Sequence, residues 1–151
     1  MIRVEEASIH TRDARLLLAE LSDTLERLTG ASGCASFAAG DIDLPRSTFV
    51  IARGNDEAPI GCGALRPVTH DTAEIKRMYA VPGSKGVGTA VLAHLEAIAA
   101  SFGYRQVCLE TRIVNEPAMR FYEKHGYCRI ENYGKYVDRP EAACFAKELH
   151  Q

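Results

Sequence analysis

The segment best suited to chemistry is a glycine-rich turn at residues 81–89, which reads Val-Pro-Gly-Ser-Lys-Gly-Val-Gly-Thr. It stands between a stretch typical of a strand and a long stretch typical of a helix. Glycine lets a ligand approach the backbone closely, and the first N–H groups of a helix are unpaired donors at the positive end of its dipole. These features favour a phosphate-binding turn. The alternative is a tight turn that uses glycine only for its geometry.

Two common phosphate-binding motifs do not fit this turn. A P-loop has lysine directly after its second glycine, whereas Lys85 precedes Gly86. A dinucleotide fingerprint that begins at Gly86 would need a third glycine where Val91 stands, and a parallel βαβ unit around it. A nucleotide-binding module therefore stays open only as a minor alternative.

The cysteines and histidines show no spacing typical of a metal site. The 5 cysteines are widely scattered without a C-x-x-C pair, and the 5 histidines form no ligand pattern. Most of the cysteines stand in apolar stretches, where a reduced cysteine acts as a small apolar side chain. We therefore expect neither a bound metal nor a cysteine nucleophile.

Composition narrows the class of protein further. Lys and Arg total 18 against 20 Asp and Glu, a net charge of −2, which argues against a domain that binds nucleic acid through its charge. No apolar run reaches the ~18 residues of a membrane span, and the first residues lack the apolar core of a signal peptide. We expect a cytoplasmic protein without nucleic-acid or membrane partners, folded as one domain over residues 1–151.

Hydrophobic periodicity predicts the elements that must position the turn. Three consecutive strands with short polar turns indicate an antiparallel meander. Glycine punctuates the ends of two helices. The predicted strands cover residues 2–7, 48–53, 60–65, 73–79, 105–111, 127–130 and 143–149, and the predicted helices cover 12–28, 86–102 and 115–125, with a further short helix within 32–46. The order β-α-α-β-β-β-α-β-α-β-β predicts a mixed, mostly antiparallel sheet flanked by helices, an α/β (α+β) fold.

Three motifs, taken in order, resemble a known family. They are the strand Ala-Glu-Ile-Lys-Arg-Met-Tyr at 73–79, the Gly-Val-Gly at 86–88, and the helical pattern that runs from Asn115 through Ala118 and Tyr122 to Gly126 and Tyr127. Together they look like the GNAT superfamily of acetyl-CoA-dependent N-acetyltransferases, over residues 48–149. The resemblance implies the same fold, acetyl-CoA (coenzyme A) as co-substrate, and a small-molecule or peptide amine as acceptor. It also leaves a homodimer open.

The resemblance implies which residues hold each substrate. Asn115 is in addition a good N-cap for the helix that follows it. The family usually has Arg or Gln where this sequence has Gly83, and Lys85 offers a compensating charge. The expected cofactor contacts are Met78, Tyr79, Ala80, Gly83, Ser84, Lys85, Gly86, Val87, Gly88, Thr89, Asn115, Ala118 and Tyr122. The expected acceptor contacts are Tyr133, Lys135 and Tyr136, together with the segment 32–46.

The resemblance also implies direct attack of the amine on the acetyl thioester, without an acyl-enzyme. The leaving thiolate profits from a proton donor, and a phenol is protonated at neutral pH, so Tyr122 is the predicted general acid. The alternative for Tyr122 is an aromatic residue of the core. An alkylammonium is mostly protonated at pH 7, so a base is needed. Glu74 is the predicted base, with Glu110 or a chain of waters as alternatives.

The missing basic residue at position 83 motivates a second function. A chain that kept the phosphate-binding turn but lost part of its charge could be a non-catalytic acyl-CoA-binding regulatory module. The two functions differ in one observable, because only the enzyme releases free coenzyme A when it is given an amine.

Overall fold

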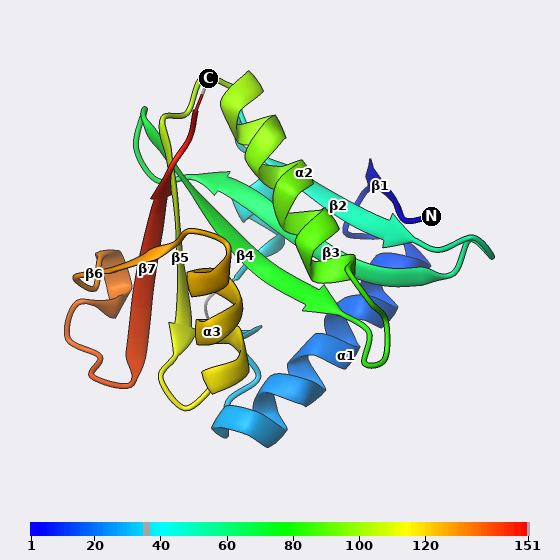
Figure 1. Ribbon diagram of the computed structural model, residues 1–151, viewed down its shortest axis with the longest axis horizontal. Coiled ribbons are helices and arrows are strands. Elements are labelled where there is room, and N and C mark those ends of the chain that lie inside the picture. Colours follow the sequence, from blue (N-terminus) through cyan, green and yellow to red (C-terminus); the bar gives the residue numbers. More distant parts are fainter. Residues whose placement is uncertain (35–36, 151) are drawn as a thin grey trace.

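The computed structural model describes residues 1–34 and 37–150. A seven-stranded sheet in the order β1-β2-β3-β4-β5-β7-β6 forms the centre of the molecule. The mixed, mostly antiparallel sheet flanked by helices is confirmed (Figure 1). Along the chain the elements are β1 (Arg3–Glu6), α1 (Arg12–Thr29), the 3₁₀ helix η2 (Ala39–Ile42), β2 (Thr48–Arg53), β3 (Pro59–Pro67), β4 (Thr72–Ala80), α2 (Val87–Ser101), β5 (Gln106–Arg112), α3 (Glu116–Lys124), β6 (Cys128–Ile130), the 3₁₀ helix η3 (Gly134–Tyr136) and β7 (Ala142–Glu148).

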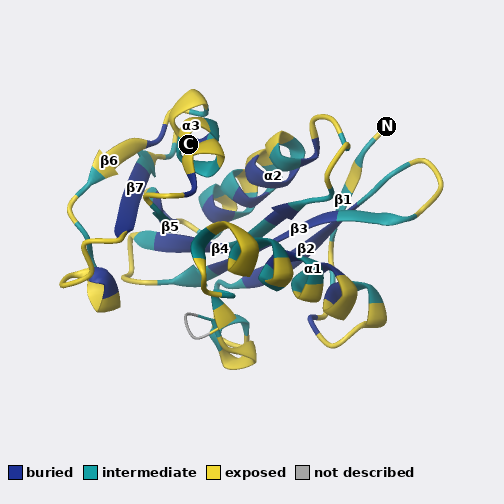
Figure 2. Cartoon of the chain, turned by 90° about the horizontal axis from the view of Figure 1, so that it is seen from below, coloured by how far each residue is buried: buried dark blue, intermediate teal, exposed yellow. Residues whose placement is uncertain are grey.

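Strands β2, β3 and β4 form the predicted antiparallel meander, and β1 pairs antiparallel with β2 at its edge. Side chains on β2 alternate between the two faces of the sheet, as the period of a strand requires. Val50 and Ala52 pack under α2, whereas Phe49 and Ile51 pack under α1. The apolar residues of β2 therefore contribute to two cores, one on each face of the sheet, and the strands between α1 and α2 are buried (Figure 2).

The helices cover both faces of the sheet. The buried face of α1 includes Leu17 and Leu21, and α2 contributes Val91 and Leu95 to the opposite core. Helix α3 lies on the same face as α2, where Tyr122 joins the same core. None of the helices in residues 1–34 and 37–150 is long and apolar enough to cross a bilayer.

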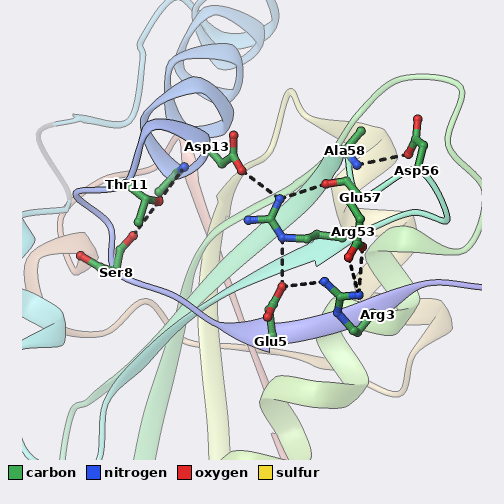
Figure 3. Close-up of polar contacts among 10 residues, drawn as sticks. Arg3, Glu5, Ser8, Thr11, Asp13, Arg53, Asp56, Glu57 and Ala58 are labelled. Atoms are coloured by element: carbon green, nitrogen blue, oxygen red, sulfur yellow. Dashed lines mark hydrogen bonds and ion pairs between the residues drawn. The ribbon is translucent and has the colours of Figure 1, made fainter.

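Local signals explain where the helices begin and end. Thr11 caps α1 by accepting a hydrogen bond from the Ala14 N–H at 3.2 Å, and Gly30 ends that helix with φ +82°. Arg53 on β2 then ties α1 to the sheet, since its guanidinium contacts Asp13 and Glu5, each at 2.9 Å (Figure 3). These contacts hold β1 and α1 against β2, at the outer edge of the sheet.

The middle of the sheet is where the two halves of the molecule part. Strands β4 and β5 run parallel, but only residues 72–74 lie opposite residues 106–108. Beyond that point the two strands diverge (Figure 1). On its other side β5 pairs with β7 along its whole length, and β6 pairs with β7 at the far edge of the sheet. The divergence leaves the second half of β4 and the end of β5 without each other as partners.

Candidate active site

The diverging strands open a cleft of about 140 Å³. Its walls come from five places in the sequence: the end of α1 and the loop after it, the bulged part of β4, the end of β5, the first turns of α3, and η3. The lining residues are Leu21, Leu25, Thr29, Ala31, Gly33, Lys76, Arg77, Met78, Glu110, Thr111, Arg112, Asn115, Ala118, Tyr122 and Tyr136. The cleft thus unites parts of the chain that the sequence keeps far apart.

A β-bulge at Arg77 shapes one wall of the cleft. The pairing of β3 with β4 shifts register between Cys62 and Ala64, and Arg77 has φ +54°. A bulge bends its strand and increases the local twist, so it turns β4 away from β5. The Arg77 guanidinium holds this backbone in place, donating to the Leu18 and Ser32 carbonyls at 3.3 Å each and to Ser22 Oγ at 2.6 Å.

The glycine-rich turn joins the end of β4 directly to α2. Gly86 is the N-cap of α2 with φ +76°, a conformation that favours glycine, and it caps without a side-chain hydrogen bond. Ser84 N–H donates to the Val81 carbonyl, and Ala90 N–H to the Gly86 carbonyl, each at 3.0 Å. Within the described chain, no protein acceptor faces the backbone N–H groups of residues 85–89. This row of unsatisfied donors at a helix N-terminus can accept an anion.

Helix α3 packs against the start of α2 and brings Tyr122 to the cleft. A Cβ added to Gly88 would lie 3.2 Å from the Phe121 ring, so glycine permits this close packing. Thr89 Oγ1 and His125 Nε2 meet at 3.1 Å across the same interface. The two predicted motifs are therefore neighbours in space, with the turn beside the helix that carries the predicted acid.

The Tyr122 side chain is 8% exposed and lines the cleft. Its ring packs edge-on against Phe121 and Tyr127, at centroid distances of 5.2 and 5.7 Å. Among the described residues its hydroxyl has no hydrogen-bond partner. Burial raises the pKa of Tyr122, so the hydroxyl keeps its proton at neutral pH. The geometry leaves this donor free for a molecule in the cleft.

Asn115 and Ala118 line the same cleft as Tyr122. The Asn115 side chain accepts from the Ala118 N–H at 3.3 Å, which confirms the predicted N-cap of α3. Met78 also lines the cleft, from β4. Its neighbour Tyr79 instead points to the opposite face, where its hydroxyl donates to Glu20 Oε1 at 3.1 Å. The Ala80 side chain packs in the core under α2.

The structure does not bring Glu74 into the cleft. Glu74 lies at the level where β4 and β5 are still paired, opposite Cys108, and it is 3% exposed. Its Oε1 accepts from Arg66 at 3.2 Å and its Oε2 from the Tyr133 hydroxyl at 2.6 Å. Both oxygens are thus occupied within the protein. The role of Glu74 as the general base therefore stays a prediction, and this geometry places its carboxylate against Arg66 and Tyr133.

Among residues 1–34 and 37–150, Glu110 is the carboxylate that lines the cleft. It projects from β5 and pairs with Arg112 at 3.4 Å. Burial raises the pKa of Glu110 above its usual range, while the neighbouring Arg112 opposes that shift. A carboxylate with a raised pKa in a cleft has the character of a general base.

Of the three predicted acceptor residues, Tyr136 lies in the cleft wall. Its hydroxyl accepts from Lys76 Nζ at 3.1 Å. Tyr133 does not line the cleft, because its hydroxyl is bound to Glu74, and burial raises its pKa so that it stays a donor. Lys135 is exposed, with its ammonium 5.9 Å from the centre of the Tyr136 ring.

Sequence reasoning missed three cations of the cleft, Lys76, Arg77 and Arg112. It also missed the apolar wall that α1 supplies with Leu21 and Leu25. A pattern within the strand gave a weak signal for Arg112, which stands two residues from Glu110 and so shares its face. Residues 35 and 36, part of the predicted acceptor segment 32–46, lie outside the described residues.

Comparison with known proteins agrees with this architecture. Residues 14–127 match the model of the acetyltransferase (GNAT) family. An uncharacterised N-acetyltransferase of Bacillus subtilis, YsnE, is 35% identical over 109 residues, which cover 70% of this chain and 72% of the relative.

Solved structures match over nearly the whole chain. The crystal structure of a putative acyl-CoA N-acyltransferase from Klebsiella pneumoniae superposes with a TM-score of 0.83 at 23% identity, over 99% of each chain. A GNAT family acetyltransferase from Elizabethkingia anophelis, solved with acetyl-CoA bound, superposes with a TM-score of 0.72 at 17% identity, over 98% of each chain. Because the family model matches residues 14–127 and the Bacillus subtilis relative is 35% identical over 70% of the chain, the chain belongs to the acetyltransferase (GNAT) family.

Proposed function

We propose that the protein transfers the acetyl group of acetyl-CoA to a primary amine by direct attack of the amine on the thioester. The single observation that carries the proposal is the open row of N–H groups at the start of α2, packed beside the helix that presents Tyr122 to the cleft. With the pyrophosphate of the cofactor bound at these N–H groups, its pantetheine arm would run along the diverging strands β4 and β5. Membership of an acyl-CoA-dependent family supports the same cofactor.

Two groups in the cleft suit the two proton transfers. Glu110 takes a proton from the ammonium of the acceptor, directly or through a water, because its raised pKa makes it a stronger base than an exposed carboxylate. The freed nitrogen forms the C–N bond to the acetyl carbon as the C–S bond breaks. Tyr122 donates its hydroxyl proton to the leaving sulfur. The nitrogen of the new amide loses its second proton, which restores the Tyr122 hydroxyl directly or through a water, and Glu110 returns its proton to solvent. Burial raises the pKa of the coenzyme A thiol as it raises the pKa of Tyr122, so transfer of the proton from the phenol to the thiolate remains feasible.

Lys85 is the proposed source of positive charge at the phosphate-binding turn. The family's basic residue is replaced by Gly83, which has φ +87° and open space around its Cα. Lys85 lies two residues further along and is exposed. A flexible ammonium at this position can approach a phosphate as a point charge.

The test is a release assay for coenzyme A, run with acetyl-CoA and a panel of primary amines, beside a calorimetric titration of acetyl-CoA. Binding together with amine-dependent thiol release is expected. Binding without release from any amine would instead favour the non-catalytic module that the change at Gly83 motivates, and no binding would remove both.

A further inference from the structure

We propose that the acceptor is an amine that also carries a carboxylate, with a free α-amino acid as the simplest case. The inference rests on the proposed function and names the substrate class of the same cleft. It follows from the charges that line the cleft, where Glu110 is the one carboxylate among the described residues and the cations are Lys76, Arg77 and Arg112. This excess of positive charge contrasts with the net charge of −2 of the whole chain.

The charge of Arg77 has no acidic partner. Its guanidinium donates only to two backbone carbonyls and a serine hydroxyl, all of them neutral. Among residues 1–34 and 37–150 no carboxylate lies within ion-pair distance of it. Burial of the guanidinium in this state leaves a positive potential at the cleft wall that an anion would relieve.

Lys76 is buried and only partly compensated. Its Nζ donates to the neutral Tyr136 hydroxyl at 3.1 Å and lies 3.8 Å from Glu74. That carboxylate is already shared, since Arg66 approaches the same oxygen at 3.2 Å. Burial lowers the pKa of Lys76, although the neighbouring Glu74 opposes that shift, in line with this partial compensation. A carboxylate in the cleft would stabilise the ammonium.

Glu110 and Arg112 place a negative and a positive charge side by side in the cleft. They stand two residues apart on β5 and therefore project to the same face of the strand, where both line the cleft. A carboxylate beside a guanidinium matches the ammonium and carboxylate of an amino acid. In the free protein Arg112 Nη1 lies 3.4 Å from Glu110 and 3.9 Å from Glu141. The ammonium of the acceptor would face Glu110, the proposed base, and its carboxylate would face the other planar donors of Arg112.

The same charges disfavour other amines. A polyamine, an aminoglycoside or a lysine-rich peptide would bring a second cation against Lys76, Arg77 and Arg112, and like charges in a cleft repel. An amine without a carboxylate would leave Arg77 without an acidic partner and Lys76 only partly compensated. The cleft therefore selects against these classes as well as for the carboxylate.

The experiment measures thiol release from acetyl-CoA with matched acceptors that differ only in the carboxylate. Leucine is compared with leucinamide and 3-methylbutylamine, and lysine with cadaverine. We expect kcat/KM to be at least about tenfold higher for the free acids, the difference that one charge-assisted hydrogen bond gives. Arg112→Gln should reduce this ratio mainly through KM. Arg120→Gln is the control, since that arginine is 72% exposed on α3 and away from the cleft.

Each outcome decides between the inference and its foundation. Equal or greater turnover of the amides and decarboxylated amines would overturn the substrate class and leave the acetyltransferase standing. An unchanged ratio in folded Arg112→Gln would also overturn it. Thiol release from none of the amines would overturn the proposed function itself, and the inference with it. The comparison of acceptors uses the unaltered protein, so it holds even where a variant fails to fold.

Discussion

Replacing Tyr122 with phenylalanine separates catalysis from stability. The substitution removes one hydroxyl that lines the cleft and has no hydrogen-bond partner among the described residues. No protein hydrogen bond is lost, so the free energy of unfolding should change by less than about 1 kcal/mol. General acid catalysis contributes roughly 10²–10⁴-fold to a rate, so kcat should fall by about 100-fold or more. The dissociation constant of acetyl-CoA should stay nearly unchanged, because the proposed phosphate site lies at the start of α2, away from the Tyr122 hydroxyl.

Tyr127 is the matched control for this substitution. It packs against Tyr122 in the same core, but its hydroxyl donates to Glu96 at 2.7 Å rather than facing the cleft. Tyr127→Phe should cost about 1.5–3 kcal/mol of stability, as expected for a hydrogen bond to a charged group, and leave kcat near the original value. Thermal unfolding and thiol release at saturating substrates measure both quantities. An unchanged kcat in Tyr122→Phe, with a normal rate of acetyl-CoA binding, would refute the role of Tyr122 as acid.

Three further substitutions test the rest of the site. In the unaltered protein, activity should fall as the pH drops through the raised pKa of Glu110, because a protonated Glu110 cannot accept a proton. Glu110→Gln should lower kcat/KM and remove this fall at low pH from the pH profile. A fall that persists in this variant would assign the base elsewhere. Glu74→Gln should lower the melting temperature, since it leaves Arg66 and Lys76 without their buried carboxylate, yet keep a kcat closer to the original than Glu110→Gln does; the reverse order would restore Glu74 as base. Gly86→Val should abolish calorimetric binding of acetyl-CoA, whereas Gly103→Val, at an equally left-handed position with φ +91° at the other end of α2, should retain it; loss of binding in both would point to general strain.

The sequence was sufficient to predict elements whose signals are local. The turn at residues 81–89 combines glycine with a long apolar helix face, and both features depend only on neighbours in the chain. The capping role of Asn115 is likewise a matter of one side chain and an N–H three residues on. The order of strands and helices is confirmed for the same reason.

Which carboxylate lines the cleft could not be predicted in this way. Glu74 and Lys76 stand on one face of β4, yet only Lys76 lines the cleft. The difference arises from the parallel register with β5, which ends at Glu74, and from Tyr133, which binds that carboxylate from a distant loop. Both depend on contacts between segments far apart in sequence. Glu110 gains its place in the cleft from the same register.

The bulge at Arg77 was also invisible in the sequence. Arginine carries no preference for a left-handed backbone, and φ +54° is uncommon for it. The conformation persists because α1 and the loop after it offer three oxygens to the guanidinium. Tertiary contacts thus determine a feature that opens the cleft.

The most direct test follows the backbone amides of residues 85–89 by ¹⁵N NMR during a titration with coenzyme A. We expect the largest shifts in this row, with Gly86, Val87 and Gly88 foremost, because their N–H groups have no acceptor in the described protein. Saturable binding that leaves these amides unmoved and shifts others would contradict phosphate binding at the start of α2.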